Sequence, residues 1–142
     1  MSDKGDDLAR DLEQRVEAIE SGYEFMLAYA AQGRETDRGA GSGRQVREYL
    51  DGMRRGLEGL ADVVRALVAA RDEEGASAAA AFLDAIERDA AVAAAAIRLV
   101  LRKEDIGSQL VDNLNACIHL RALLTDLFIV DEWRKNRTGR GG

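Results

Sequence analysis

The sequence contains no proline, one cysteine, one histidine and few aromatic residues, which make up 5% of its 142 residues. A single cysteine excludes an intramolecular disulfide framework, and a single histidine does not provide the usual zinc ligand sets. β-Sandwiches and β-barrels depend on aromatic residues in strands and proline in turns, so the composition disfavours both folds. The commonest residue is alanine, the strongest helix former, and we therefore predict an all-α protein.

Acidic residues outnumber basic ones, 26 against 20, which gives a net charge of −6. A nucleic-acid partner is not expected, because binding one requires a net cationic face. The cations near the C-terminus and the final Gly141-Gly142 suggest two alternatives, an Arg-Gly tail that contacts RNA and a terminus activated as in modifier proteins. Motifs this short often match by chance, so neither alternative is favoured.

The first residues, Met-Ser-Asp-Lys-Gly-Asp-Asp, show no apolar segment behind a basic start, so no signal peptide is predicted. The most apolar stretch, residues 116–130, is interrupted by polar side chains and is too short to span a bilayer. The length fits one domain. We therefore expect a cytoplasmic single-domain protein without a membrane partner.

Apolar residues recur at helical spacing in four segments, which cover about residues 7–33, 42–71, 77–103 and 108–135. Ser42 and Gln45 fit a capping box at the start of the second helix. Near-equal helices with short connections predict a four-helix bundle, antiparallel and up-down-up-down, although the loop 34–43 is long enough for a crossover. This glycine-rich loop lacks the lysine of a phosphate-binding loop, and we expect it to be mobile.

The expected bundle domain covers residues 7–135. An acidic segment, residues 1–6, and a basic glycine-rich tail, residues 136–142, flank it and are expected to be disordered and flexible, because neither can bury apolar surface.

The second expected helix carries Gly52, Gly56 and Gly59 on one strip, and the third carries alanines on several sides. Small residues let helix axes approach closely, so we expect these two helices to face one another at short distance. A groove that accepts a ligand or a partner helix is the alternative interpretation of the glycine strip.

The fourth expected helix is apolar nearly all the way round, whereas a helix buried on one side keeps its outer face polar. Because a four-helix bundle has no central helix, we expect this one to contact a second chain, in a homo-oligomer or with another protein. The expected contact residues are Ala116, His119, Leu123, Val130 and Trp133. Trp133 is typical of the aromatic anchors that dominate interface energetics.

His119 is the first candidate for phosphoryl chemistry, since it is the only histidine. Asp112 and Asp126 lie seven residues to either side, about 10 Å away along a helix, and cannot form a triad with it. Phosphotransfer by a helical bundle with His119 as the phosphoryl acceptor is therefore an alternative function, for which the sequence predicts no second catalytic residue beside His119.

Two carboxylate pairs at i,i+3 spacing, Glu17 with Glu20 and Asp84 with Glu87, offer a second alternative, a magnesium-dependent helical nucleotide hydrolase. Charge runs on long helices are more often solvated faces, so we expect no metal or cofactor. The favoured function is a non-enzymatic protein-interaction module, an adaptor, assembly factor or regulator, acting through the fourth helix.

Overall fold

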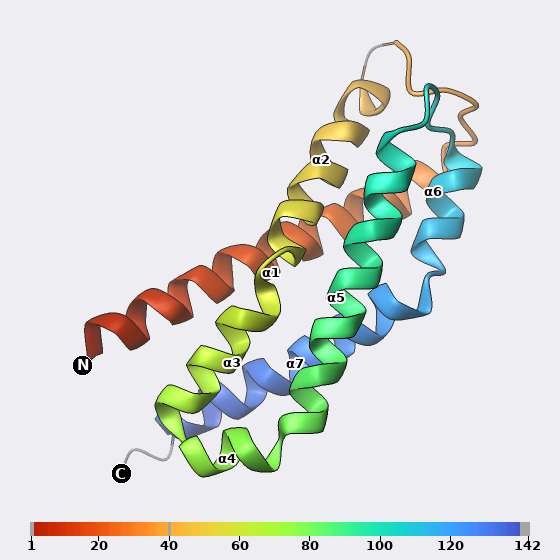
Figure 1. Cartoon of the computed structure of the whole chain (residues 1–142). Helices are drawn as coiled ribbons and strands as arrows, with labels where there is room; N and C mark the ends of the chain where they lie inside the picture. Colours follow the sequence, from red (N-terminus) through yellow and green to blue (C-terminus); the bar gives the residue numbers. More distant parts are fainter. Residues whose placement is uncertain (1, 40, 140–142) are drawn as a thin grey trace.

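A computed structural model describes the backbone of residues 2–39 and 41–139, and this part of the chain forms seven helices and no strand (Figure 1). The helices are α1 (Ser2–Ala30), α2 (Ser42–Leu57), α3 (Leu60–Arg71), α4 (Glu73–Ala78), α5 (Ala80–Leu101), α6 (Ser108–Asn115) and α7 (Ile118–Gly139). The prediction of an all-α protein is confirmed.

Two long helices organise the packing. The first, α1, packs against α2, α3 and α6, and the second, α5, packs against α2, α3 and α7. In Figure 1, α2 and α3 follow one another beside α5, while α1 crosses behind them and α7 returns toward the lower end of α3. The core between them contains the largest fully buried side chains, among them Ile19, Tyr29, Met53, Ile86 and Leu120.

The second expected helix is broken into α2 and α3. At the break, Gly59 has a φ of +88°, in the left-handed region that glycine adopts without steric cost. Arg15 of α1 donates hydrogen bonds to three carbonyl oxygens at the end of α2, those of Arg55, Gly56 and Glu58. A helix end leaves such carbonyls without intrahelical partners, so Arg15 stabilises the break.

The second and third expected helices do pack together, since α2 and α3 both contact α5, but Gly56 of the glycine strip approaches α1 instead. A Cβ placed on Gly56 would lie 3.1 Å from the carbonyl oxygen of Arg15 and 3.3 Å from Cγ1 of Ile19. A Cβ on Gly52 would meet no atom within 4 Å, and Gly59 serves the turn. Gly56 therefore packs closely against the backbone of α1, and Gly59 lies against the Arg15 guanidinium, where a Cβ would be 3.3 Å from Nη2.

The fourth expected helix is also broken, because α6 ends at Asn115 and α7 begins at Ile118. The two axes differ by 50°, which lets α6 pack on α1 and α7 on α5. None of the described helices is by itself long and apolar enough to cross a membrane. Only α6 and residues 118–135, taken as a bent pair, reach that length and composition.

Smaller differences from the expected boundaries concern the termini and the caps. Helix α1 begins at Ser2, so residues 2–6 are helical, whereas Met1 and the Gly141-Gly142 terminus lie outside the described residues. The expected capping box does not form: the N-cap of α2 is Gly41, and Ser42 Oγ accepts a hydrogen bond from Gln32 Nε2 (3.0 Å). A short additional helix, α4, precedes α5.

The loop expected to be mobile is tied to the loop between α5 and α6. We call this network the loop clamp; it comprises residues 34–38 and 101–108 together with Tyr29 and Arg47. The Arg34 N–H donates to Ser108 Oγ and the Ser108 N–H donates to the Arg34 carbonyl oxygen, both at 2.8 Å. The buried Tyr29 hydroxyl donates to the carbonyl oxygen of Ile106 at 2.7 Å.

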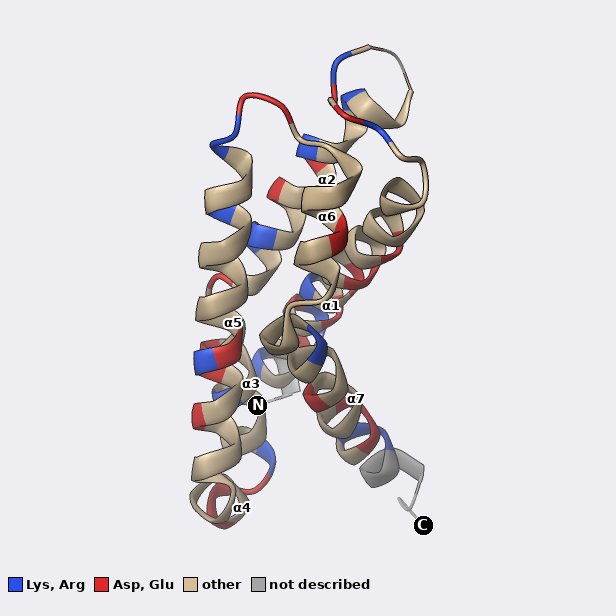
Figure 2. Cartoon of the chain, turned by 90° about the vertical axis from the view of Figure 1, so that its right-hand side faces the viewer, with Lys and Arg blue, Asp and Glu red and all other residues tan. Residues whose placement is uncertain are grey.

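An ion pair at the centre of the loop clamp joins Asp37 and Arg47, with 2.7 Å between Oδ2 and Nε. The other carboxylate oxygen of Asp37 accepts the Ile106 N–H at 2.8 Å, and Arg47 donates to the carbonyl oxygens of Leu101, Lys103 and Glu104. Burial alone would raise the pKa of Asp37, but the hydrogen bonds from Arg47 and Ile106 outweigh it and lower that pKa below its usual value. Figure 2 shows these charged loops gathered at one end of the molecule.

Candidate functional site

The structure separates the five residues expected to contact a partner. Leu123 and Val130 belong to the hydrophobic core, with exposed fractions of 0% and 4%, so the expectation that they lie on an outer face is wrong. Ala116 is exposed at the end of α6, and Trp133 is exposed on α7. His119 is half-buried beside α5.

The side of α7 opposite to Leu123 and Val130 also carries large apolar side chains, and these are exposed to solvent. The exposed fractions are 72% for Ile118, 60% for Phe128 and 54% for Ile129. At 100° per residue these side chains fall on one half of the helix surface, which we call the α7 outer face. Its residues are Ile118, Arg121, Ala122, Thr125, Phe128, Ile129, Glu132 and Trp133.

Two opposite charges lie along one border of the α7 outer face. Arg121 and Glu132 are both exposed, and neither forms an ion pair with any described residue. On the helical wheel they are separated by about 20°, and three turns of helix separate them along the axis. In Figure 2, α7 diverges from α5 toward its C-terminal end.

His119 meets a carboxylate that the sequence interpretation missed. Its Nδ1 lies 2.8 Å from Oδ1 of Asp89, which comes from α5, 30 residues away in the chain. The neighbouring Asp126 has a raised pKa, first because it is partly buried and second because Asp89 carries a like charge. The acid at His119 thus comes from the packing of α5 on α7, which spacing along one helix could not reveal.

The two carboxylate pairs do not assemble into one site. Asp84 and Glu87 both accept hydrogen bonds from Arg65 of α3, and the Asp84 contact measures 2.9 Å. Glu17 is exposed on α1. Among the described side chains, those of residues 4–39 and 41–135, no three His, Cys, Asp or Glu residues are arranged to hold a metal ion.

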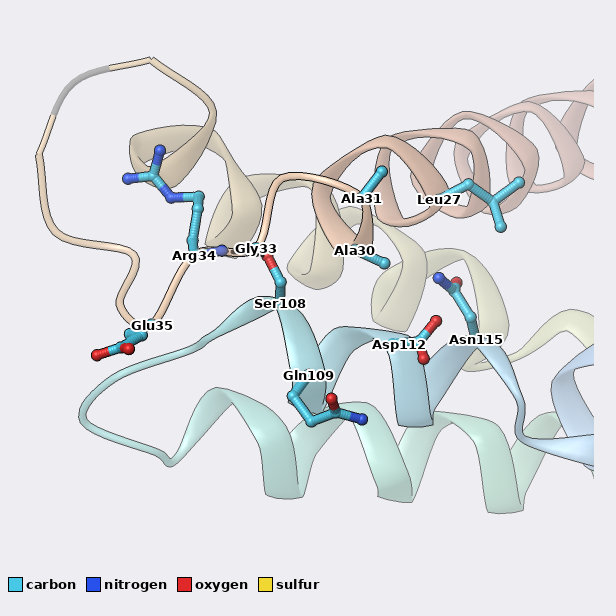
Figure 3. Close-up of a pocket in the computed structure, with 10 residues that line it drawn as sticks. All are labelled: Leu27, Ala30, Ala31, Gly33, Arg34, Glu35, Ser108, Gln109, Asp112 and Asn115. Carbon is cyan, nitrogen blue, oxygen red and sulfur yellow. Dashed lines mark hydrogen bonds between the residues drawn. The ribbon is translucent and has the colours of Figure 1, made fainter.

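A pocket of about 490 Å³ lies between the C-terminal end of α1 and α6 (Figure 3). Leu27, Ala30 and Ala31 form its apolar wall, and the polar wall comes from α6. In Figure 3 the Asp112 carboxylate and the Asn115 amide both point toward α1, whereas the Arg34 guanidinium turns away. That guanidinium donates to the carbonyl oxygens of Thr36 and Arg38 in its own loop.

Asn115 is the unusual residue of this pocket. It is 7% exposed, and neither its amide nitrogen nor its amide oxygen has a hydrogen-bond partner. A buried amide without partners costs about 1–3 kcal/mol per unsatisfied group, so such residues are rare in folded proteins. Sequence patterns could not reveal this pocket, because its walls come from segments about 80 residues apart.

Comparison of the chain with protein-family models, with curated proteins and with solved structures finds no match.

Proposed function

We propose that this chain is a bent four-helix bundle that acts as a protein-interaction module, an adaptor, assembly factor or regulator, and that its α7 outer face binds a second copy of the chain. The observation that carries the proposal is the exposure of Ile118, Phe128 and Ile129 on one side of one helix. Contiguous exposed apolar surface is unfavourable in water and commonly marks an interaction site.

A second copy fits this face because of its charges. When two identical helices pack antiparallel about a two-fold axis, the same border of each helix meets. An axis beside Thr125 and Asp126 then places Arg121 of each copy near Glu132 of the other, and Ile118 of each copy toward Trp133 of the other. In a parallel pair about a two-fold axis along the helices, opposite borders meet, and Arg121 and Glu132 would face the border with Ala122 and Trp133 instead of a partner charge. We therefore propose the antiparallel pair, in which opposite charges meet.

The first test is the solution mass, measured by light scattering over a concentration series. The wild type is expected to form a dimer that dissociates on dilution, and Ile129→Asp is expected to be monomeric at every concentration. Leu99→Asp is the matched control, because Leu99 is 71% exposed but lies on α5. A wild type that stays monomeric throughout, or equal effects of both substitutions, contradicts the homodimer.

A charge exchange tests the antiparallel geometry. Arg121→Glu and Glu132→Arg are each expected to weaken association about tenfold, because each places like charges at the interface. The double variant restores opposite charges and is expected to recover most of the wild-type affinity. If the two effects simply add, Arg121 and Glu132 do not meet across the interface.

The contact between His119 and Asp89 supports a second candidate, phosphotransfer on His119. A carboxylate at Nδ1 orients the ring and makes Nε2 the more nucleophilic nitrogen. Incubation with phosphoramidate followed by intact-mass spectrometry is expected to show one phosphoryl group, absent from His119→Gln and slower to form in Asp89→Asn. An unmodified wild type rejects this candidate.

A further inference from the structure

We infer that the pocket between α1 and α6 binds a small organic cation that carries hydrogen-bond donors on a short aliphatic stem, namely an alkylguanidinium or alkylammonium group. This inference is independent of the α7 outer face. It depends on the charge of the pocket, on the unpaired Asn115 amide and on the apolar wall.

The electrostatics of the pocket favour a positive charge. Asp112 points its carboxylate toward α1 and forms no ion pair with any described residue (Figure 3). The C-terminal end of α1 also borders the pocket, and a helix C-terminus carries a partial negative charge. No basic residue lies in the last turn of α1. Two carboxylates, Asp112 and Glu35, line the pocket against one cation, Arg34, so its described lining carries a net negative charge. The Arg34 guanidinium turns away from α1 and donates to carbonyl oxygens of its own loop.

The polar and apolar groups specify the rest of the ligand. The Asn115 amide oxygen can accept a hydrogen bond from a guanidinium or ammonium N–H, which removes part of the cost of its burial. Because both amide atoms are shielded from solvent, a ligand reaches them by rotation of the Asn115 side chain into the pocket. Leu27, Ala30 and Ala31 provide a surface for a few methylene groups, and the volume suits a small molecule.

The acidic groups do not form a metal site, because Asp112 and Glu35 belong to no group of three His, Cys, Asp or Glu side chains that could hold a metal ion among the described residues. A hydrated divalent cation would also leave the apolar wall unused. An organic cation uses the charge, the amide and the wall together, and for this reason we assign that class.

Titration of the protein with n-butylguanidinium, followed by ¹H–¹⁵N correlation NMR, tests the inference. We expect saturable shifts of the Ala31 and Gly33 amides and of the Asn115 side-chain NH₂ group. N-Butylurea has the same shape without the charge and is expected to bind at least about tenfold more weakly. Absence of saturable shifts at these positions, or equal binding of both compounds, overturns the inference.

Two variants localise the binding. Asp112→Asn removes the charge from an exposed position and is expected to weaken butylguanidinium binding about tenfold, whereas Asp62→Asn, in a second hollow between α3 and α5, is expected to leave it unchanged. Asn115→Leu replaces an unpaired buried amide by a group of similar size, so the variant is expected to fold and to lose binding. Equal binding by wild type, Asp112→Asn and Asn115→Leu overturns the assignment.

The cation can come from a free metabolite or from an arginine side chain of a peptide. The doubly capped peptide acetyl-Gly-Arg-Gly-amide separates these sources. Tighter binding of the peptide than of butylguanidinium assigns the site to peptides, and weaker binding assigns it to free cations. Either result supports the chemical class, and binding of neither compound overturns it.

Discussion

The loop clamp and the α7 outer face differ in what surrounds their side chains. In the loop clamp, charged and polar groups of two loops find partners across the chain. Arg47 of α2 pairs with Asp37 and donates to the carbonyl oxygens of Leu101, at the end of α5, and of Lys103 and Glu104 in the loop that follows. On the α7 outer face, large apolar groups such as Phe128 remain exposed. The sequence predicted a mobile polar loop, whereas the loop is held by hydrogen bonds; it also predicted an exposed apolar side on the last helix but placed the buried Leu123 and Val130 there.

These two regions show that a segment is held in place by the contacts its side chains make, whether those side chains are polar or apolar. A hydrogen-bonded loop becomes a fixed part of the structure when each donor and acceptor is satisfied, because an unpaired buried group costs more than a pair gains. An apolar side chain stabilises the fold only where other atoms exclude water from it. The α7 helix therefore stabilises the monomer through one side, and its other side is available for association.

The largest expected effect compares the two sides of α7. Leu123→Ala removes buried methyl groups from the core and is expected to lower the free energy of unfolding by about 2–5 kcal/mol. Ile129→Ala, on the exposed side, is expected to change it by no more than about 0.5 kcal/mol. Urea denaturation at low protein concentration measures both values, and similar costs would show that the two sides are equally covered.

An intermediate effect is expected where the loop clamp loses its central carboxylate. Asp37→Asn breaks the ion pair with Arg47 and is expected to lower the free energy of unfolding by about 1.5–3 kcal/mol at pH 7. Because Arg47 and Ile106 hold the pKa of Asp37 below its usual value of 3.8, the stabilisation is present above that pH and is lost as the pH falls through the lower, folded-state pKa. The difference between wild type and Asp37→Asn is therefore expected to shrink in acid.

Urea titrations at pH 7 and at pH 3 provide the measurement for Asp37. Asp62→Asn is the control, since Asp62 is an exposed carboxylate outside the loop clamp. A difference between wild type and Asp37→Asn that stays constant over this range would mean that the loop clamp does not depend on the ionised carboxylate.

The smallest expected effect has the opposite sign. Burial, and then the charge of Asp89, raise the pKa of Asp126 above 3.8, so the ionised carboxylate is unfavourable in the folded state. Asp126→Asn is expected to stabilise the protein at pH 7, by less than about 1 kcal/mol. This gain is expected to disappear as the pH falls through the raised pKa toward 3.8, because the wild type then becomes neutral as well.

Thermal unfolding at pH 7 and at pH 4 checks the prediction for Asp126, with Glu132→Gln as the control on the exposed side of the same helix. A lower melting temperature for Asp126→Asn at pH 7 would show that the carboxylate makes a favourable contact that outweighs its burial.

The sequence predicted the long helices and the three connections between its four segments, but not the breaks inside the second and fourth segments. Gly59 interrupts a regular pattern of leucine and valine that continues from α2 into α3, so the apolar periodicity gave no sign of the turn. The break before Ile118 contains neither glycine nor proline. Both breaks depend on contacts with other helices, such as the contact of Arg15 with the end of α2, and these contacts are long-range.

The candidate sites illustrate the same limit. A helix that is apolar all round shows no preferred inner side, and the sequence interpretation therefore placed Leu123 and Val130 outside although they are buried. Asp89 could not be paired with His119 by spacing, because the two residues belong to different helices. The Asn115 pocket needs α1 and α6 together, and neither segment alone has a recognisable motif.

Helix propensity and apolar periodicity act over neighbouring residues, so the all-α class and the approximate course of the long helices were predictable from the amino-acid order. Packing of the folded chain sets which side of α7 is buried, where the helices bend, how the two loops are joined and which polar groups remain unpaired. Each of these features depends on contacts between residues distant in the chain, and the free energy of such contacts is set by packing and desolvation once the helices meet.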